Sequence, residues 1–236
     1  MKQTLKAAIL TLGQLTLIPA IVLSILYPPS TGWIVTTVIF SYIFSVIGWI
    51  IAQHRLFSHK QFKVNRPTEI VLSLIGVIGT WQSPIEWAAI HLKHHKHSDT
   101  ELDIHSTKYL GWKNAFFIFH NPGDFKMSMA IGRLAKDKWH LFLVYSKYIL
   151  IALYAGIVYN MYNIEGIIYL WLVPTAYSFL SQILIVLNHH QGEPINSSWV
   201  NWVTLGEGNH KNHHDNASSY QTDYLIKPII DTLKIS

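Results

Sequence analysis

The segment His91-Leu92-Lys93-His94-His95 carries three histidines at positions i, i+3 and i+4. On a helix this spacing places all three side chains on one face, within reach of a common ion. The same spacing returns in His210-Lys211-Asn212-His213-His214, and a looser pair, His54 and His59, precedes both. Because the chain contains no cysteine, these clusters predict a metal centre that distant segments build from imidazole ligands.

The composition indicates a membrane protein with a sizeable polar part. Half of the 236 residues are hydrophobic and 13% are charged, with a mean hydropathy of +0.24. These values are high for a soluble domain and low for a protein that lies wholly in lipid. The net charge of +5 favours attraction to an anionic leaflet, and we expect no nucleic-acid partner.

Four apolar segments are long enough to span a hydrocarbon core of roughly 30 Å. They are residues 7–27, 31–52, 141–159 and 166–187. The first is too long for a signal peptide and has no clear cleavage site, so we interpret it as a retained anchor. The apolar segment 70–79 is too short to span. Lys147, near the start of the third segment, is expected to extend to the interface.

The distribution of positive charge predicts the topology. The short connectors 28–30 and 160–165 contain no Lys or Arg, whereas residues 53–140 hold twelve of the eighteen. The positive-inside rule then places both termini and the segments 53–140 and 188–236 in the cytoplasm. The fold prediction is one all-α integral membrane domain over residues 1–236. Its four transmembrane helices carry a cytosolic helical head with a histidine-rich site.

The number of histidines predicts two ions. Eight imidazoles (His54, His59, His91, His94, His95, His210, His213 and His214) exceed the ligands that one ion can take. An all-imidazole site with room for O2 suits iron in oxidative chemistry, although zinc binds such a site at least as well. The alternative interpretation is a solvated Lys- and His-rich face that touches lipid headgroups.

The three clusters resemble the histidine boxes of membrane fatty acid desaturases of the stearoyl (Δ9) type. The matching segments are residues 54–59, His91-x-x-His94-His95 and 206–214, which begins Gly206-Glu207-Gly208. The similarity runs from about residue 45 to 232. It implies four transmembrane helices, a cytosolic head, a nine-histidine di-iron site and O2-dependent formation of a cis double bond in an acyl chain.

The resemblance also implies a ninth ligand at the end of the fourth helix, three residues before a glycine. That position is His189, ahead of Gly192, and the adjacent His190 is its competitor. The family's usual Asn, four residues before this histidine, holds a metal-bound water. Here Ile185 takes that position.

A second departure bears on the substrate. In acyl-CoA desaturases a charged Arg-Asp pair precedes the second box and helps to hold the CoA headgroup. Here Ala89-Ile90 occupies those positions, which removes both charges. An acyl chain on a membrane lipid is therefore at least as well suited as acyl-CoA.

The resemblance implies further roles for particular residues. Asp99, Asp103 and Glu207 are candidates to accept the second N–H of ligand imidazoles. Trp81 and Trp87 are candidates for the lining of the acyl tunnel. The cofactors would be two Fe ions and O2, and a separate donor of the cytochrome b5 or ferredoxin type would supply electrons.

Two other functions remain open at this point. A related di-iron hydroxylase or ketolase that acts on lipids or carotenoids would use the same metal chemistry. A histidine-rich metal transporter would place its ligands within spanning helices, whereas the predicted spans are nearly free of charge.

Overall fold

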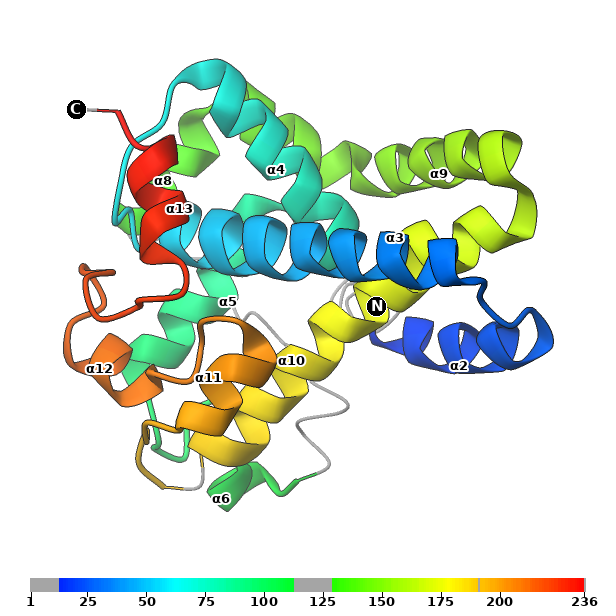
Figure 1. Ribbon diagram of the computed structural model, residues 1–236. Helices are drawn as coiled ribbons and strands as arrows, with labels where there is room; N and C mark the ends of the chain where they lie inside the picture. The colour runs from blue at the N-terminus through cyan, green and yellow to red at the C-terminus, as the bar shows by residue number, and fades with distance from the viewer. Residues whose placement is uncertain (1–12, 113–128, 191, 236) are drawn as a thin grey trace, which may run out of the picture.

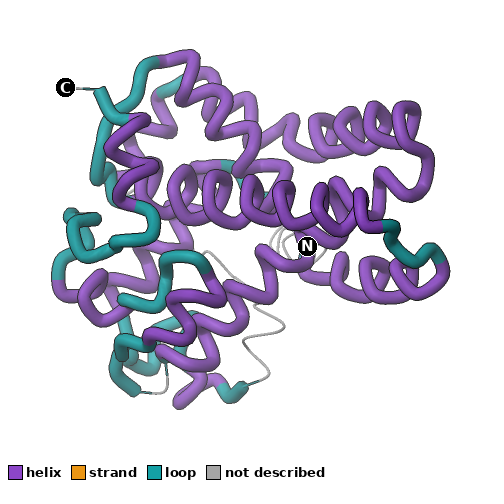
Figure 2. The backbone as a smooth tube through the Cα atoms, viewed as in Figure 1, coloured by secondary structure: helices purple, strands orange, loops and turns teal. Residues whose placement is uncertain are grey.

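The computed structural model describes residues 13–112, 129–190 and 192–235, and helices build all of its regular structure within those ranges (Figure 2). The helices are η1 (Gln14–Thr16), α2 (Leu17–Leu26), α3 (Thr31–Tyr42), η2 (Ile43–Ser58), α4 (Arg66–Thr80), α5 (Pro84–His97), α6 (Thr107–Leu110), α8 (Met129–Lys136), α9 (Lys138–Ile167), η3 (Ile168–Leu172), α10 (Val173–His189), α11 (Ser198–Thr204), α12 (His210–Asp215) and α13 (Lys227–Leu233). The prediction of an all-α fold is confirmed for this part of the chain.

Two helical segments are long and apolar enough to cross a membrane. They are Thr31–Ser58, which joins α3 to η2, and Lys138–His189, which joins α9, η3 and α10. In their most apolar windows only 39% and 28% of the residues are buried. A core helix of a soluble protein would bury most of its apolar surface, so these exposed faces favour contact with lipid.

The described residues do not confirm four spans. The predicted spans 141–159 and 166–187 both lie within Lys138–His189, which Figure 1 shows doubling back after the long arm of α9, and the helical backbone is interrupted at Asn163. Asn163 has φ 54° and ψ −150°, a conformation that interrupts the helix and lets its two arms run back alongside each other. The predicted span 7–27 begins outside the described residues, and its described part, Gln14–Leu26, is shorter than a span.

Local sequence signals fix the two short helices beside η2. Asn65 accepts a hydrogen bond from the backbone N–H of Thr68 and starts α4, whose length agrees with the short apolar segment predicted at 70–79. Ser83 and Glu86 form a reciprocal capping box at the start of α5. This cap defines where the helix that carries His91, His94 and His95 begins.

The position of Lys147 differs from the prediction. Its side chain is 3% exposed and forms an ion pair with Glu86 in the first turn of α5, instead of extending to an interface. A buried ammonium needs such a partner, because leaving it unpaired in an apolar environment is costly. The pair therefore links α9 to the histidine-bearing α5.

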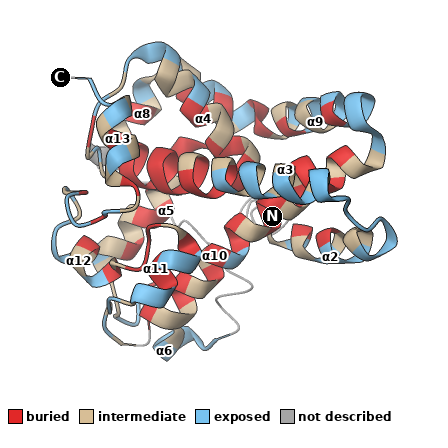
Figure 3. Cartoon of the chain, in the orientation of Figure 1, coloured by how far each residue is buried: buried red, intermediate tan, exposed pale blue. Residues whose placement is uncertain are grey.

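The main hydrophobic core is built around η2, most of which is buried and red in Figure 3. It draws side chains from η2, α5, α8, α11 and α13, among them Ile51, Ala88, Leu134, Val200 and Ile230. Packing of these five helices holds the end of η2 close to α5. The head thereby fixes the backbone positions from which the histidines project.

Candidate metal centre

Nine histidines from four parts of the chain converge in the head. His54 lies in the last turns of η2 and His59 directly follows it, α5 and α12 each carry three, and His190 follows α10. They divide into a five-histidine group (His54, His59, His91, His95 and His213) and a four-histidine group (His94, His190, His210 and His214). Within each group the ligand nitrogens lie within 4.8 Å of one another.

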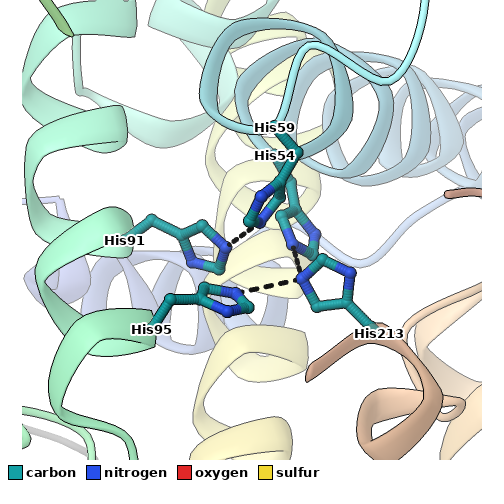
Figure 4. A group of neighbouring side chains, drawn as sticks. All are labelled: His54, His59, His91, His95 and His213. Atoms are coloured by element: carbon teal, nitrogen blue, oxygen red, sulfur yellow. Dashed lines mark hydrogen bonds between the residues drawn. The ribbon is translucent and has the colours of Figure 1, made fainter. Parts of the chain in front are cut away.

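The imidazoles of the five-histidine group point at a common centre (Figure 4). The Nε2 atoms of His54 and His213 are 2.8 Å apart, and those of His59 and His91 are 2.7 Å apart. The Nε2 atoms of His95 and His213 are 3.1 Å apart. Every member of the group thus presents Nε2 toward the same small volume.

The four-histidine group has the same construction. The Nε2 atoms of His94 and His214 are 3.2 Å apart, and those of His210 and His214 are 3.1 Å apart. The Nε2 atom of His190 lies 2.9 Å from that of His210. One face of α5 therefore serves both groups, since His91 and His95 join the first and His94 joins the second.

Both groups are suited to transition-metal ions, because of the distances between their imidazole nitrogens and because of the lowered pKa of their histidines. Imidazole nitrogens at roughly 2.1 Å from a divalent ion are roughly 3 Å from their neighbours, which matches these contacts. Burial lowers the pKa of His91, His94, His210 and His213 well below its ordinary value, and lowers that of His214 to about 4. Neutral imidazoles keep the free electron pairs that a metal needs.

The three carboxylates predicted from the sequence lie behind histidines of both groups. His94 Nδ1 is 2.7 Å from Asp103 Oδ1, and His54 Nδ1 is 2.9 Å from Glu207 Oε1. The third pair, His190 Nδ1 and Asp99 Oδ1, is longer at 3.6 Å. A carboxylate that accepts Nδ1–H fixes the tautomer and leaves Nε2 free to bind an ion.

His190, and not His189, joins the four-histidine group. The His189 ring lies with its centroid 5.1 Å from that of His210, but its Nδ1 donates a hydrogen bond to the carbonyl of Ile195 and its nitrogens are not among the converging ligand atoms. The reason is that α10 ends at His189, so His190 leaves the helical path with φ −121° and its ring faces His210. The position three residues before Gly192, which the resemblance implies for the ninth ligand, is therefore not the one whose ring joins this group.

Sequence reasoning missed two charged residues, Arg55 and Asp223, that lie behind the five-histidine group. Arg55 is 1% exposed, and its guanidinium lies 3.0 Å from Glu207 Oε1 and 3.0 Å from Asp223 Oδ2. The same guanidinium lies 2.9 Å from His213 Nδ1. Arg55 directly follows His54 in a segment otherwise free of charge, and this position could have indicated a buried ion pair. No comparable sequence pattern marks Asp223, which lies outside the histidine clusters.

A narrow cavity of about 60 Å³ opens beside both groups. We call this space the site cavity. The residues that line it are Gln14, Trp49, His54, Gln82, Trp87, Ile90, His91, His94, His105, Phe179, Gln182, Ile185, Val186, His190, Glu207 and His210. Trp87 is in this lining, as expected. Trp81 is not, because its ring stacks on Trp171 with the ring centroids 5.7 Å apart.

Comparison with known proteins identifies the family. The family model of fatty acid desaturases matches residues 30–221, which include all nine histidines and the lining of the site cavity except Gln14. The chain belongs to the fatty acid desaturase family. The resemblance seen in the three histidine boxes is confirmed at this level.

The relatives of this chain include two lipid desaturases and one acyl-CoA desaturase. The sn-1 stearoyl-lipid 9-desaturase of Anabaena variabilis is 30% identical over 185 residues, 71% of this chain. The sn-2 palmitoyl-lipid 9-desaturase of Nostoc sp. (strain 36) is 29% identical over 73% of this chain. The acyl-CoA C20 Delta5-desaturase of Anemone leveillei is 30% identical over 80% of this chain. Each match covers 66% of the relative's length, slightly under two thirds.

We expect Asp103→Asn to weaken metal binding by about 10–100-fold. The Asp103 carboxylate accepts from His94 Nδ1 and from the backbone N–H groups of Asp99 and His105, so an amide nitrogen would oppose a donor. Competition between the purified protein and a chromophoric chelator measures this affinity. Glu101→Gln, on the exposed part of the same loop, is the matched control and should bind as the unaltered protein does. Equal affinity of both variants would contradict the assigned role of Asp103.

We expect the metal-free protein to lose stability steeply as the pH falls below about 6.5. Outside the candidate spans, burial lowers the pKa of seven histidines, namely His59, His91, His94, His95, His210, His213 and His214. Below pH 6.5 the unfolded chain therefore binds protons that the folded chain does not, which favours unfolding by about 1.4 kcal/mol per proton and pH unit.

Three buried carboxylates with a raised pKa (Asp103, Glu207 and Asp223) oppose this trend but are outnumbered. Denaturant unfolding of the metal-free protein in detergent, at several pH values, measures the slope. A slope near zero between pH 6.5 and 4 would show that these histidines are not buried in the metal-free fold.

Proposed function

We propose that this protein desaturates a fatty acyl chain with two iron ions, one in each histidine group. One observation carries the proposal: the Nε2 atoms of nine imidazoles converge in two adjacent groups beside one cavity. When bound, the iron ions supply the oxidising power that removes two hydrogens from an unactivated acyl chain, with O2 as oxidant.

The nine histidines would bind the ions, and the carboxylates behind them orient the imidazole rings. Asp103 and Glu207 accept Nδ1–H from His94 and His54, so both rings keep Nε2 toward the ions. Arg55 neutralises Glu207 and Asp223, which otherwise would be two carboxylates buried close together. The protein's share of catalysis is therefore a preformed, oriented ligand set.

The site cavity positions the acyl chain. The apolar and aromatic side chains of Trp87, Ile90, Phe179, Ile185 and Val186 line it next to the histidines, and exclude water from the methylenes that lie there. An acyl chain held in this cavity would lie beside the histidines that would bind the ions, which would replace a bimolecular encounter with an oriented one. Ile185, at the position of the family Asn, contributes to this apolar wall.

We infer that the substrate is an acyl chain on a membrane lipid and that the bond forms at the Δ9 position. Ile90 lies in the cavity wall where acyl-CoA desaturases have a charge, so the CoA phosphates would lack a partner there. Two of the relatives are named as lipid 9-desaturases. Electrons would come from a separate protein of the cytochrome b5 or ferredoxin type.

The proposed setting is an integral membrane protein with four spans and with both termini in the cytoplasm. The exposed apolar faces of Thr31–Ser58 and of both arms of Lys138–His189 support the last three spans. The histidine groups lie at the ends of η2 and α10 beside the charged head, which agrees with the positive-inside assignment.

Product analysis in a desaturase-deficient host tests the proposal. The host expresses the protein and receives a labelled saturated fatty acid, and lipid-bound and CoA-bound chains are separated at early times. We expect cis-monounsaturated chains to appear first in the lipid pool. Hydroxylated chains would instead identify a hydroxylase, and label that appears first in acyl-CoA would overturn the lipid substrate. Lys211→Ala, an exposed change beside His210, is the matched control and should leave the product unchanged.

A further inference from the structure

The short helix α11 presents an exposed apolar face next to the metal centre. Trp199, Trp202 and Val203 are 56%, 61% and 47% exposed, and together they are defined here as the α11 face. The opposite side of the helix is buried through Val200 and Thr204. Exposing two neighbouring tryptophans of a seven-residue helix to water is unfavourable, and contiguous exposed apolar surface commonly marks an interaction site.

The α11 face is continuous with a candidate membrane span. The Tyr177 hydroxyl, on α10, donates a hydrogen bond of 2.6 Å to the carbonyl of Val203. Tyr177 lies twelve residues before the end of α10, whereas His190 of the four-histidine group directly follows that end. The helix α11 therefore lies alongside α10 (Figure 1), on which Leu180 is also exposed.

The charge pattern of this segment suits a lipid interface. Residues 194–206 contain no Asp, Glu, Lys or Arg, so the α11 face has no charge of its own to pair with a protein partner. Tryptophan is enriched at the boundary between hydrocarbon and headgroups, where its ring is buried and its N–H stays hydrated.

We propose that the α11 face docks on the surface of a phospholipid bilayer, with both indoles at the headgroup level. The proposal rests on the membrane setting proposed above and not on the reaction. It places lipid beside Glu207, which follows α11 by three residues and lines the site cavity.

Two other occupants fit the structure less well. A second copy of the chain would need about 800 Å² of complementary surface on each partner, far more than three side chains of one short helix provide. An electron-donor protein would be recognised through complementary charge, which this face lacks.

Site-directed spin labelling tests the proposal in the full chain. Because the sequence contains no cysteine, Trp199→Cys and Trp202→Cys each give a single labelling position. The labelled proteins are reconstituted in vesicles of phosphatidylcholine and phosphatidylglycerol, and collision of the nitroxide with O2 and with a soluble nickel chelate is measured. Leu180→Cys, on the exposed side of α10, and Ser218→Cys, in the exposed tail of the head, are the matched controls.

We expect labels at positions 199 and 202 to collide more with O2 than with the nickel chelate, as at position 180, with the opposite order at position 218. The same order at 199 and 202 as at 218 would overturn the proposal, because it would place the α11 face in water. Labels shielded from both reagents would also overturn it, and would indicate a protein partner such as a second copy.

Discussion

Replacing His94 by alanine should abolish desaturation, with a loss of product of at least about 100-fold. The His94 Nε2 lies 3.2 Å from that of His214, in the group with four histidines instead of five. Its removal leaves three imidazoles for that ion, and it deprives the buried Asp103 carboxylate of its imidazole partner. We therefore expect the iron of the four-histidine group to be lost and the other iron to be kept.

Two measurements separate this loss from a general failure to fold. Iron per chain in the purified variant should fall by half, and the yield of detergent-soluble protein should stay close to that of the unaltered chain. Lys96→Ala, an exposed change on the same helix, is the matched control and should keep both irons and the product. Full iron occupancy together with full product in His94→Ala would remove His94 from the ligand set.

The spacing of the histidines predicted that they share one helix face. It did not predict that they divide between two metal-binding groups. Positions i, i+3 and i+4 place His91, His94 and His95 on one side of α5 whatever the helix packs against. Which ion each one serves depends on where the ends of η2 and α12 meet that face. That meeting is set by packing of the head core, which no local pattern encodes.

Two residues lie differently from their expected positions, for one physical reason. The family spacing to Gly192 favours His189, but α10 ends at this residue and the chain leaves the helical path at His190. Trp81, a candidate for the tunnel lining, stands at the C-cap of α4 with φ 60°, and its ring stacks on Trp171. In both cases one backbone angle at a helix end decides the direction of the side chain.

Buried ion pairs were the least predictable part of the centre. Lys147 and Glu86 are 61 positions apart in sequence, and Arg55 and Asp223 are 168 apart. Hydropathy identifies an isolated charge in an apolar segment, but it does not identify the partner that makes burial tolerable. Only the packed head brings such partners together.

Arg55→Met should lower the free energy of unfolding by about 3–5 kcal/mol. Methionine fills most of the arginine volume, so the main loss is electrostatic. Glu207 and Asp223 are each 2% exposed, and both face the Arg55 guanidinium at 3.0 Å. Even with Arg55 present, burial raises the pKa of Asp223 to about 6. Without the guanidinium, folding would have to bury two unpaired carboxylates or take up protons.

Denaturant unfolding of the metal-free protein in detergent at pH 7.5 measures this loss, and a second substitution tests its cause. Asp223→Asn removes one of the two stranded charges, so the double variant Arg55→Met/Asp223→Asn should be more stable than Arg55→Met alone. Lys211→Met breaks the exposed pair with Asp215 and should cost no more than about 1 kcal/mol. If Arg55→Met were as stable as Lys211→Met, the buried carboxylates would have to be protonated already in the folded protein. In that case Glu207 could not serve as the ionised partner of His54.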